Sequence, residues 1–169
     1  MAYVGMGSNL GDREAFLRSG LEGMARGGLV AARVSSVWET QPVDSPGSPW
    51  FLNLVAGFEA AISPLEMLDL LLAVERDVGR VRTVRNAPRV LDLDLLLMGD
   101  LCLDGPRLVL PHPRMWSRRF VLDPLAEIAP GLRDPRSGRS VEEVLAALRN
   151  PERVRRLGPL VPGGGRGGL

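Results

Sequence analysis

The stretch VLDLDLLLMG at residues 90–99 places two aspartates inside an otherwise apolar run. Successive side chains of a strand point to opposite faces, so we expect a buried strand with both aspartates on one face. One face would carry Leu91, Leu93, Leu95 and Leu97, and the other Val90, Asp92, Asp94 and Leu96. The two carboxylates would then stand about 7 Å apart along the strand. Like charges so close repel unless a positive group lies between them, so the stretch predicts a cation site.

Length and composition indicate one globular domain. The chain has 169 residues, of which 45% are hydrophobic and 24% charged, which are ordinary values for a globular protein. Its net charge of +1 argues against nonspecific electrostatic binding of nucleic acid. A lone Cys102 suits a reducing compartment. The N-terminus does not resemble a signal peptide, and the apolar runs fall short of the ~20 residues of a membrane span. We expect a cytoplasmic protein, a monomer, with neither a nucleic-acid nor a membrane partner.

The sequence contains no lysine, and all 21 of its basic residues are arginine. This excludes a P-loop lysine, a protein-kinase strand lysine and a Schiff-base lysine. The use of arginine without lysine reflects the overall composition of the chain, but it still removes every reaction that needs a lysine side chain. If this protein handles phosphate, arginine and metal must do so.

The alternation of apolar segments with turn residues predicts the fold. Strands are expected at 2–6, 29–38, 51–60, 90–97 and 108–110, and helices at 13–25, 64–78, 115–123 and 141–149. Capping boxes at Ser63–Glu66 and Ser140–Glu143 begin two of these helices. The order predicts an α+β fold, a single-domain ferredoxin-like plait with a mostly antiparallel sheet and helices packed on its faces, in three layers α/β/α. Residues 1–157 would form the domain and 158–169 a Gly-rich tail.

Asp92 and Asp94 carry the strongest chemical signal. Mg²⁺ is typically held by one or two carboxylates together with substrate phosphates, although two aspartates on a solvated strand face would give the same pattern. Four arginines precede the pair, Arg80, Arg82, Arg85 and Arg89. Alone such a run indicates a solvated loop, but beside a metal site it resembles half of a polyphosphate clamp, to which Arg118 and Arg119 could add.

Three further features are ambiguous from the residues alone. His112, the only histidine, lies between two prolines, and a lone loop histidine is more often incidental than catalytic. Glu75 falls on the apolar stripe of its helix and needs either an arginine or a ligand as partner. Gly5-Met6-Gly7 departs from a dinucleotide-binding turn because the third glycine falls at Gly11, so a tight turn explains it.

Several segments together closely resemble the hydroxymethyldihydropterin pyrophosphokinases of folate biosynthesis. They are GSNLGD at 7–12, SSVWETQPV at 35–43, FLNLV at 51–55, GRVR at 79–82, APRVLDLDLLL at 87–97 and LPHPRMWSRRFVLDPLAEIAP at 110–130. The resemblance runs in order from residue 1 to about residue 132. It implies that the hydroxymethyl oxygen of 6-hydroxymethyl-7,8-dihydropterin attacks the β-phosphorus of ATP, so that pyrophosphate is transferred and AMP released.

The resemblance also implies roles for individual residues. Asp92 and Asp94 would hold two Mg²⁺ ions, and Arg80 and Arg89 would meet the transferring phosphates. The implied ATP-binding residues are Glu75, Arg82, His112 and Arg118. The implied pterin-binding residues are Thr40, Val43, Phe51, Asn53 and Phe120, with the two aromatic rings stacking on the flat pterin.

The sequence departs from the family pattern at Gln41, Leu72, Asn86, Ala87 and Pro113, which concern the closing loop and the adenine contacts rather than the metal site. Two other functions remain as alternatives. Another metal-dependent nucleotidyl or phosphoryl transferase with a DxD strand would release ADP or pyrophosphate instead of AMP. A non-catalytic ligand- or RNA-binding plait would need no acidic pair and would use aromatic strand positions for stacking.

Overall fold

The computed structural model describes residues 1–43, 46–79 and 90–162. Its strands are β1 (Ala2–Ser8), β2 (Ala31–Val34), β3 (Val37–Thr40), β4 (Phe51–Phe58), β5 (Asp92–Met98), β6 (Leu103–Asp104), β7 (Val109–Leu110) and β8 (Val154–Gly158). Its helices are α1 (Arg13–Arg26), α2 (Pro64–Gly79), α3 (Arg119–Ile128) and α4 (Val141–Ala147), and a 3₁₀ turn covers Met115–Ser117.

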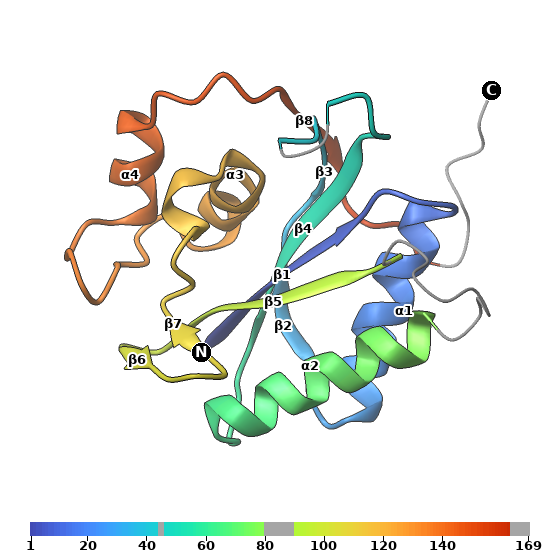
Figure 1. Ribbon diagram of the computed structural model, residues 1–169, viewed down its shortest axis with the longest axis horizontal. Helices are drawn as coiled ribbons and strands as arrows, with labels where there is room; N and C mark the ends of the chain where they lie inside the picture. The colour runs from blue at the N-terminus through green and yellow to red at the C-terminus, as the bar shows by residue number, and fades with distance from the viewer. Residues whose placement is uncertain (44–45, 80–89, 163–169) are drawn as a thin grey trace.

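The main sheet is antiparallel throughout. Its strands follow the order β5-β1-β4-β3-β8, and β2 also pairs with β4, while β6 and β7 form a separate pair. Figure 1 shows α1 and α2 on one face of this sheet and α3 and α4 on the other. The predicted α+β plait with three layers is confirmed.

Each face of the sheet has its own core. The first packs under α1 and α2 and includes Val4, Met6, Leu17, Leu54, Phe58, Leu71, Leu91, Leu93 and Leu95. The second packs under α3 and α4 and includes Tyr3, Val55, Leu96, Leu97, Met115, Leu122, Leu125 and Val141. Both predicted capping boxes form, because Glu66 accepts from Ser63 N at 2.7 Å and Glu143 accepts from Ser140 N at 2.8 Å.

A β-bulge interrupts the alternation predicted for residues 90–97. Val4 pairs with Leu95 and Tyr3 with Leu97, so Leu96 is the extra residue on β5. The prediction that Leu97 shares the face of Leu95 is therefore wrong, because Leu96 and Leu97 both pack into the second core. Val90 precedes the strand and packs into the first core rather than beside the aspartates.

The single strand predicted at 29–38 is divided into β2 and β3 at two buried serines. The Ser35 hydroxyl accepts from Val55 N at 2.9 Å, where a straight strand would offer a backbone carbonyl. Ser36 turns its N–H away to Glu127 Oε1 at 3.1 Å. These side-chain bonds replace part of the ladder, which a pattern of apolar residues does not reveal.

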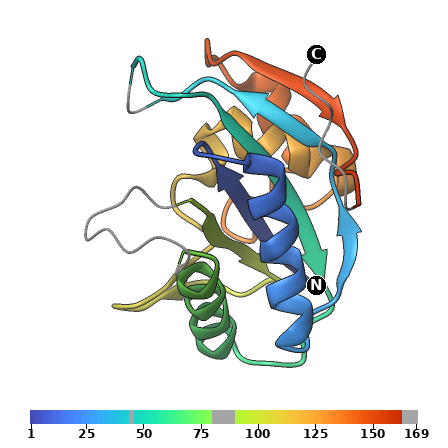
Figure 2. The same cartoon turned by 90° about the vertical axis from the view of Figure 1, so that its right-hand side faces the viewer.

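The C-terminal part also differs from prediction. The helix expected at 115–123 is a short 3₁₀ turn followed by α3, which continues past Pro124 because Val121, Leu122 and Leu125 on the same side are buried. β8 was not predicted, and it pairs with β3 (Figure 2). Leu157 and Leu160 pack against the first core, so the start of the expected tail is held against the protein. The boundary between domain and tail stays a prediction.

Candidate active site

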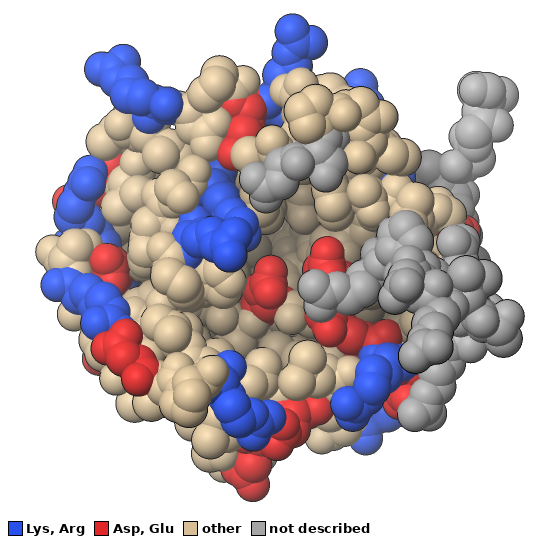
Figure 3. Space-filling view, in the orientation of Figure 1, with Lys and Arg blue, Asp and Glu red and all other residues tan. Residues whose placement is uncertain are grey.

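A pocket of about 210 Å³ lies on the α3 side of the sheet. β1, β4 and β5 form its floor, and the loop after β3 and the start of α3 form its walls. Figure 3 shows this face hollowed, with acidic and basic side chains around the hollow. Eight residues predicted for the site line the pocket: Thr40, Val43, Phe51, Asn53, Asp92, Asp94, Arg118 and Phe120.

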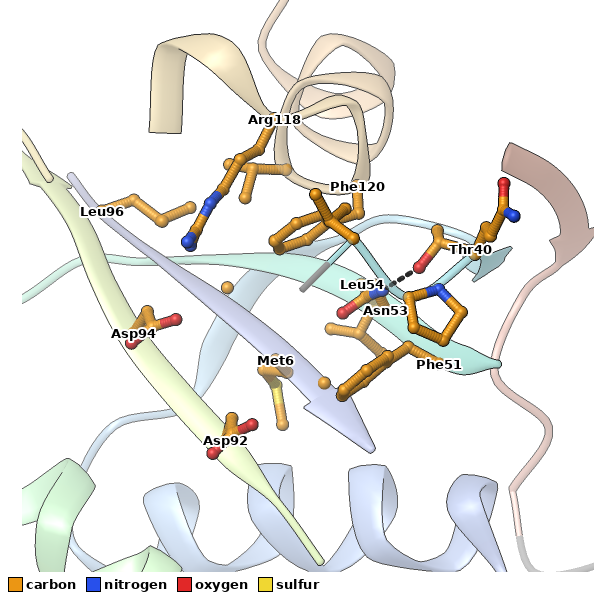
Figure 4. A pocket seen from close by; sticks show the side chains of 16 residues that line it. Met6, Thr40, Phe51, Asn53, Leu54, Asp92, Asp94, Leu96, Arg118 and Phe120 are labelled. Carbon is orange, nitrogen blue, oxygen red and sulfur yellow. Dashed lines mark hydrogen bonds between the residues drawn. The ribbon is translucent and has the colours of Figure 1, made fainter. Parts of the chain in front are cut away.

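The carboxylate pair lies on one face of β5 as the strand pattern predicts. Asp92 is partly buried and Asp94 is exposed, and both side chains line the pocket (Figure 4). Asp92 pairs across the sheet with Gly7, and Asp94 pairs with Gly5. Because glycine has no side chain, β1 contributes only backbone to the pocket lining at these two positions.

A basic group faces this pair from α3. Figure 4 shows the Arg118 side chain extending from the start of the helix toward the side of the pocket that holds Asp94. Its guanidinium carbon lies 5.2 Å from the centre of the Phe120 ring, a cation–π contact that helps to fix its direction. Positive and negative groups therefore meet across one open space.

His112 lies next to the pocket rather than among the residues that line it. Its backbone N–H donates to Leu96 O at 2.8 Å, and its Nδ1 accepts from Arg114 N at 3.2 Å. Burial, with Arg118 and Arg114, lowers the pKa of His112 below its usual value, although Asp94 acts in the opposite direction. A neutral ring with Nδ1 as acceptor carries its proton on Nε2, so His112 offers one N–H donor.

The opposite half of the pocket is aromatic and amide-lined. Figure 4 shows the rings of Phe51 and Phe120 on opposite sides of the Asn53 side chain. Asn53 Nδ2 donates to Thr40 Oγ1 at 2.6 Å, and both residues are buried. This bond fixes the orientation of the amide, because it leaves Oδ1 on the other side of the group.

The interpretation of Gly5-Met6-Gly7 as a tight turn is wrong, because both glycines lie within strand β1 and line the pocket, a role that sequence reasoning missed. A Cβ on Gly7 would lie 2.6 Å from Asn53 Oδ1, so the amide occupies the space where any other residue would place its side chain. The signal was present in the sequence, since two glycines spaced by two share one strand face. Without the pairing of β1 between β4 and β5 it had no functional meaning.

Glu75 is not among the residues that line the pocket. Its Oε1 accepts a hydrogen bond from Leu93 N at 2.7 Å, so it contacts the backbone between the two aspartates. Arg119 forms an ion pair with Asp123 at 3.0 Å on its own helix. Arg80, Arg82, Arg85 and Arg89 lie outside the described residues.

The donor set fits a hard divalent cation bound together with a phosphate ligand. Within residues 1–43, 46–79 and 90–162, no group of three or more His, Cys, Asp and Glu gathers into a metal site. A pair of carboxylates at an open pocket therefore suits Mg²⁺, which keeps waters and substrate phosphates among its ligands. In the same part of the chain, no helix is both long and apolar enough to span a membrane.

Comparison with known proteins decides the family. The family model described as 7,8-dihydro-6-hydroxymethylpterin-pyrophosphokinase matches residues 3–130. The chain belongs to this family. The resemblance in the sequence is therefore confirmed, and so is the enzyme class, a pyrophosphokinase of folate biosynthesis that transfers pyrophosphate from ATP to 6-hydroxymethyl-7,8-dihydropterin. A different DxD transferase is not favoured.

Relatives of this pyrophosphokinase family cover most of the chain. Proteins named 2-amino-4-hydroxy-6-hydroxymethyldihydropteridine pyrophosphokinase include one from Pseudomonas aeruginosa, 45% identical over 148 residues, which are 86% of this chain and 90% of the relative. Another with this name, from Bacillus subtilis, is 42% identical over 129 residues, 76% of this chain and 77% of the relative.

Solved structures share the fold of this pyrophosphokinase. The crystal structure of wild-type Plasmodium falciparum HPPK-DHPS matches with a TM-score of 0.66 and 13% identity. The match covers 86% of this chain but 40% of that one, so the chain spans less than half of the solved protein. At this identity the likeness concerns the fold alone.

Proposed function

We propose that the pocket above Gly5 and Gly7 brings the two substrates of this pyrophosphokinase together. The observation that supports the proposal is that one pocket joins two different halves. One half is flat and aromatic, as a planar heterocycle requires, and the other carries a carboxylate pair opposite an arginine. A pterin alcohol and a nucleoside triphosphate need these two surroundings side by side.

In the aromatic half, the pterin stacks between Phe51 and Phe120. The Asn53 amide, held by Thr40, recognises the polar edge of the ring with one donor and one acceptor. Thr40, at the end of β3, and Val43, in the loop after it, add backbone contacts. A substrate that lacks this polar edge would leave the buried amide without its partners, which is how the half selects a pterin.

In the charged half, the ATP phosphates meet donors from two directions. Arg118 reaches them from α3, and the neutral His112 offers its Nε2–H from the loop after β7. The family resemblance would add Arg80, Arg82 and Arg89, which lie outside the described residues, to the positive side. Glu75, which the resemblance also implies for ATP binding, does not line the pocket. Because the chain has no lysine, arginine supplies all of its permanent cationic contacts with phosphate.

Asp92 and Asp94 hold two Mg²⁺ ions together with the phosphates of ATP. When bound, the metal neutralises phosphate charge and orients the attacking hydroxyl. The two side chains are suited to this because they project from neighbouring positions on one strand face into the pocket, where the paired residues of β1 are glycines without side chains.

The reaction follows from this placement. The hydroxymethyl oxygen forms a bond with the β-phosphorus, and the bond from that phosphorus to the bridging oxygen of the α-phosphate breaks. AMP leaves with the bridging oxygen, and the pterin keeps the pyrophosphate. Such a transfer depends mainly on positioning and charge neutralisation, which the pocket supplies without a dedicated general base.

The product and the acid pair test the proposal together. AMP should appear in step with pterin consumption, whereas ADP or free pyrophosphate would contradict it. Asp94→Ala should abolish Mg²⁺-dependent turnover while the pterin still binds. Asp100→Ala, an exposed acidic position just beyond β5, is the matched control and should retain activity. Equal activity of both variants would refute the assignment of the metal site.

The setting is also part of the proposal. The single exposed Cys102 suits a reducing compartment, and we place the enzyme in the cytoplasm as a monomer. Size-exclusion chromatography with light scattering would test the monomer, and a dimer mass would contradict it.

A further inference from the structure

The strand that carries the two aspartates lies at the edge of the main sheet. β5 pairs with β1 on one side, and within the described residues no strand of the sheet lies beyond it. An edge strand has every second N–H and C=O directed away from the sheet, without ladder partners. Such a strand needs other contacts if its side chains are to keep fixed positions.

Two contacts hold the outer side of β5, one on each side of Asp94. Glu75 Oε1, from α2, accepts from Leu93 N at 2.7 Å. His112 N, from the loop after β7, donates to Leu96 O at 2.8 Å. The first is a side-chain contact that a substitution can remove, and the second is made by the backbone.

The Leu93 N–H belongs to the peptide that joins Asp92 to Leu93. N–H groups alternate in direction along a strand, so those of Asp92 and Asp94 point toward β1, opposite Gly7 and Gly5. β1 therefore holds the strand from the inside and Glu75 from the outside. With both sides fixed, the peptide cannot rotate and the two carboxylates keep their direction into the pocket.

The surroundings of Glu75 explain why a carboxylate stands there. Leu71 and Val74 on the same helix are buried in the first core, and Val78 packs against it. A carboxylate on such a stripe is costly unless it accepts hydrogen bonds, and the exposed edge of β5 provides an unpaired backbone donor that needs an acceptor. The pattern of apolar residues left this partner open between an arginine and a ligand.

We propose that Glu75 is a positioning residue of the metal site, which acts through the backbone of Leu93. This inference rests on the proposed function of Asp92 and Asp94 as Mg²⁺ ligands, and it assigns Glu75 a role other than direct contact with ATP. Groups that orient metal ligands typically change metal affinity or activity about 10- to 100-fold when they are removed.

Two substitutions separate the acceptor from the charge. Glu75→Gln keeps an oxygen that accepts from Leu93 N but removes the charge. Glu75→Met keeps the length of the side chain, suits the apolar stripe and removes both oxygens. Asp69→Ala is the matched control, since Asp69 is an exposed acidic residue of the same helix whose ion pair with Arg107 lies outside the pocket.

The first measurement needs neither metal nor turnover. Amide hydrogen exchange at Leu93 should be on the order of tenfold faster in Glu75→Met than in wild type, and close to wild type in Glu75→Gln and Asp69→Ala. The second measurement is binding of Mn²⁺ in the presence of a non-hydrolysable ATP analogue. Glu75→Met should weaken it about 10- to 100-fold, whereas Glu75→Gln should change it only slightly.

Two results would overturn the inference. If Glu75→Met leaves both Leu93 exchange and Mn²⁺ binding unchanged, Glu75 does not position the strand. If Glu75→Gln weakens Mn²⁺ binding as much as Glu75→Met while Leu93 stays protected, the charge acts directly on the metal or the nucleotide. Failure of the proposed function is a separate result, because it would appear as undiminished Mn²⁺ binding in Asp94→Ala.

Discussion

A methyl group added at Gly7 tests how tightly the pocket holds its amide. A Cβ there would lie 2.6 Å from Asn53 Oδ1, well inside the 3.4–4 Å of ordinary van der Waals contact. The neighbouring atom is the end of a side chain, but this side chain is buried and bonded to Thr40. In Gly7→Ala, Asn53 must therefore rotate, and its bond with Thr40 must lengthen or break.

The magnitude follows from the hydrogen bonds that a displaced Asn53 amide can no longer make with the pterin. Leaving a buried polar group without its partner costs about 1–3 kcal/mol, which corresponds to a pterin Kd about 5- to 150-fold higher. Alanine favours a strand over glycine by about 0.5–1 kcal/mol, which offsets part of the cost to the fold. The loss in pterin affinity should accordingly exceed the loss in the free energy of unfolding.

The assay is a titration of pterin fluorescence with wild type, Gly7→Ala, Asn53→Ala and the double variant. If the methyl group acts through the amide, Gly7→Ala should weaken pterin binding little in a protein that already carries Asn53→Ala. The losses of binding free energy in the two single variants should then be far from additive in the double variant. Binding of a non-hydrolysable ATP analogue should change little. A wild-type pterin Kd in Gly7→Ala, or an equal loss on both backgrounds, would refute the reasoning.

Three other substitutions test neighbouring parts of the argument. Thr40→Val should raise the KM for the pterin several-fold without changing that for ATP, and Thr40→Ser should restore it, because only the hydroxyl holds the amide. Arg89→Ala should lower kcat far more than it weakens nucleotide binding, as steady-state kinetics and a binding titration would show, since its charge is expected to act in the transition state. Burial of Glu127 opposes its ionisation, but hydrogen bonds from Ser36, Trp38 and Arg156 outweigh it and lower its pKa. The charged form therefore stabilises the fold above about pH 4.5 and loses this contribution as the pH falls through the lowered pKa. Denaturant unfolding should give wild type a higher free energy of unfolding than Glu127→Gln near pH 6, and this difference should shrink as the pH is lowered below 4.5.

The part of the site that side chains specify could be predicted from the sequence. Strand alternation placed Asp92 and Asp94 on one face, and they lie there in the structure. The family resemblance selected Phe51 and Asn53, which line the same pocket. The roles of these residues stay predictions, but their common location is an observation.

What escaped prediction depends on pairing between distant segments. The position of Gly7 in the site follows only from its pairing with Asn53 on β4 and with Asp92 on β5. The Ser35 hydroxyl ends a strand because Val55 reaches it across the sheet. β8 is similar: its burial is only partial and its sequence is rich in arginine, so nothing local distinguishes it from a tail.

The pocket that Gly5 and Gly7 line makes the stability of the fold depend on the bound ligand. Where α3 and α4 cover the sheet, their side chains fill the second core, but the pocket that Gly5 and Gly7 line leaves about 210 Å³ without protein atoms. A bound ligand completes this layer, and only the folded chain can bind it. At a hundredfold excess over Kd the gain is about 2.7 kcal/mol, which for a domain of this size raises Tm by about 5–11 °C. Thermal shift alone can therefore rank pterins and inhibitors without any turnover.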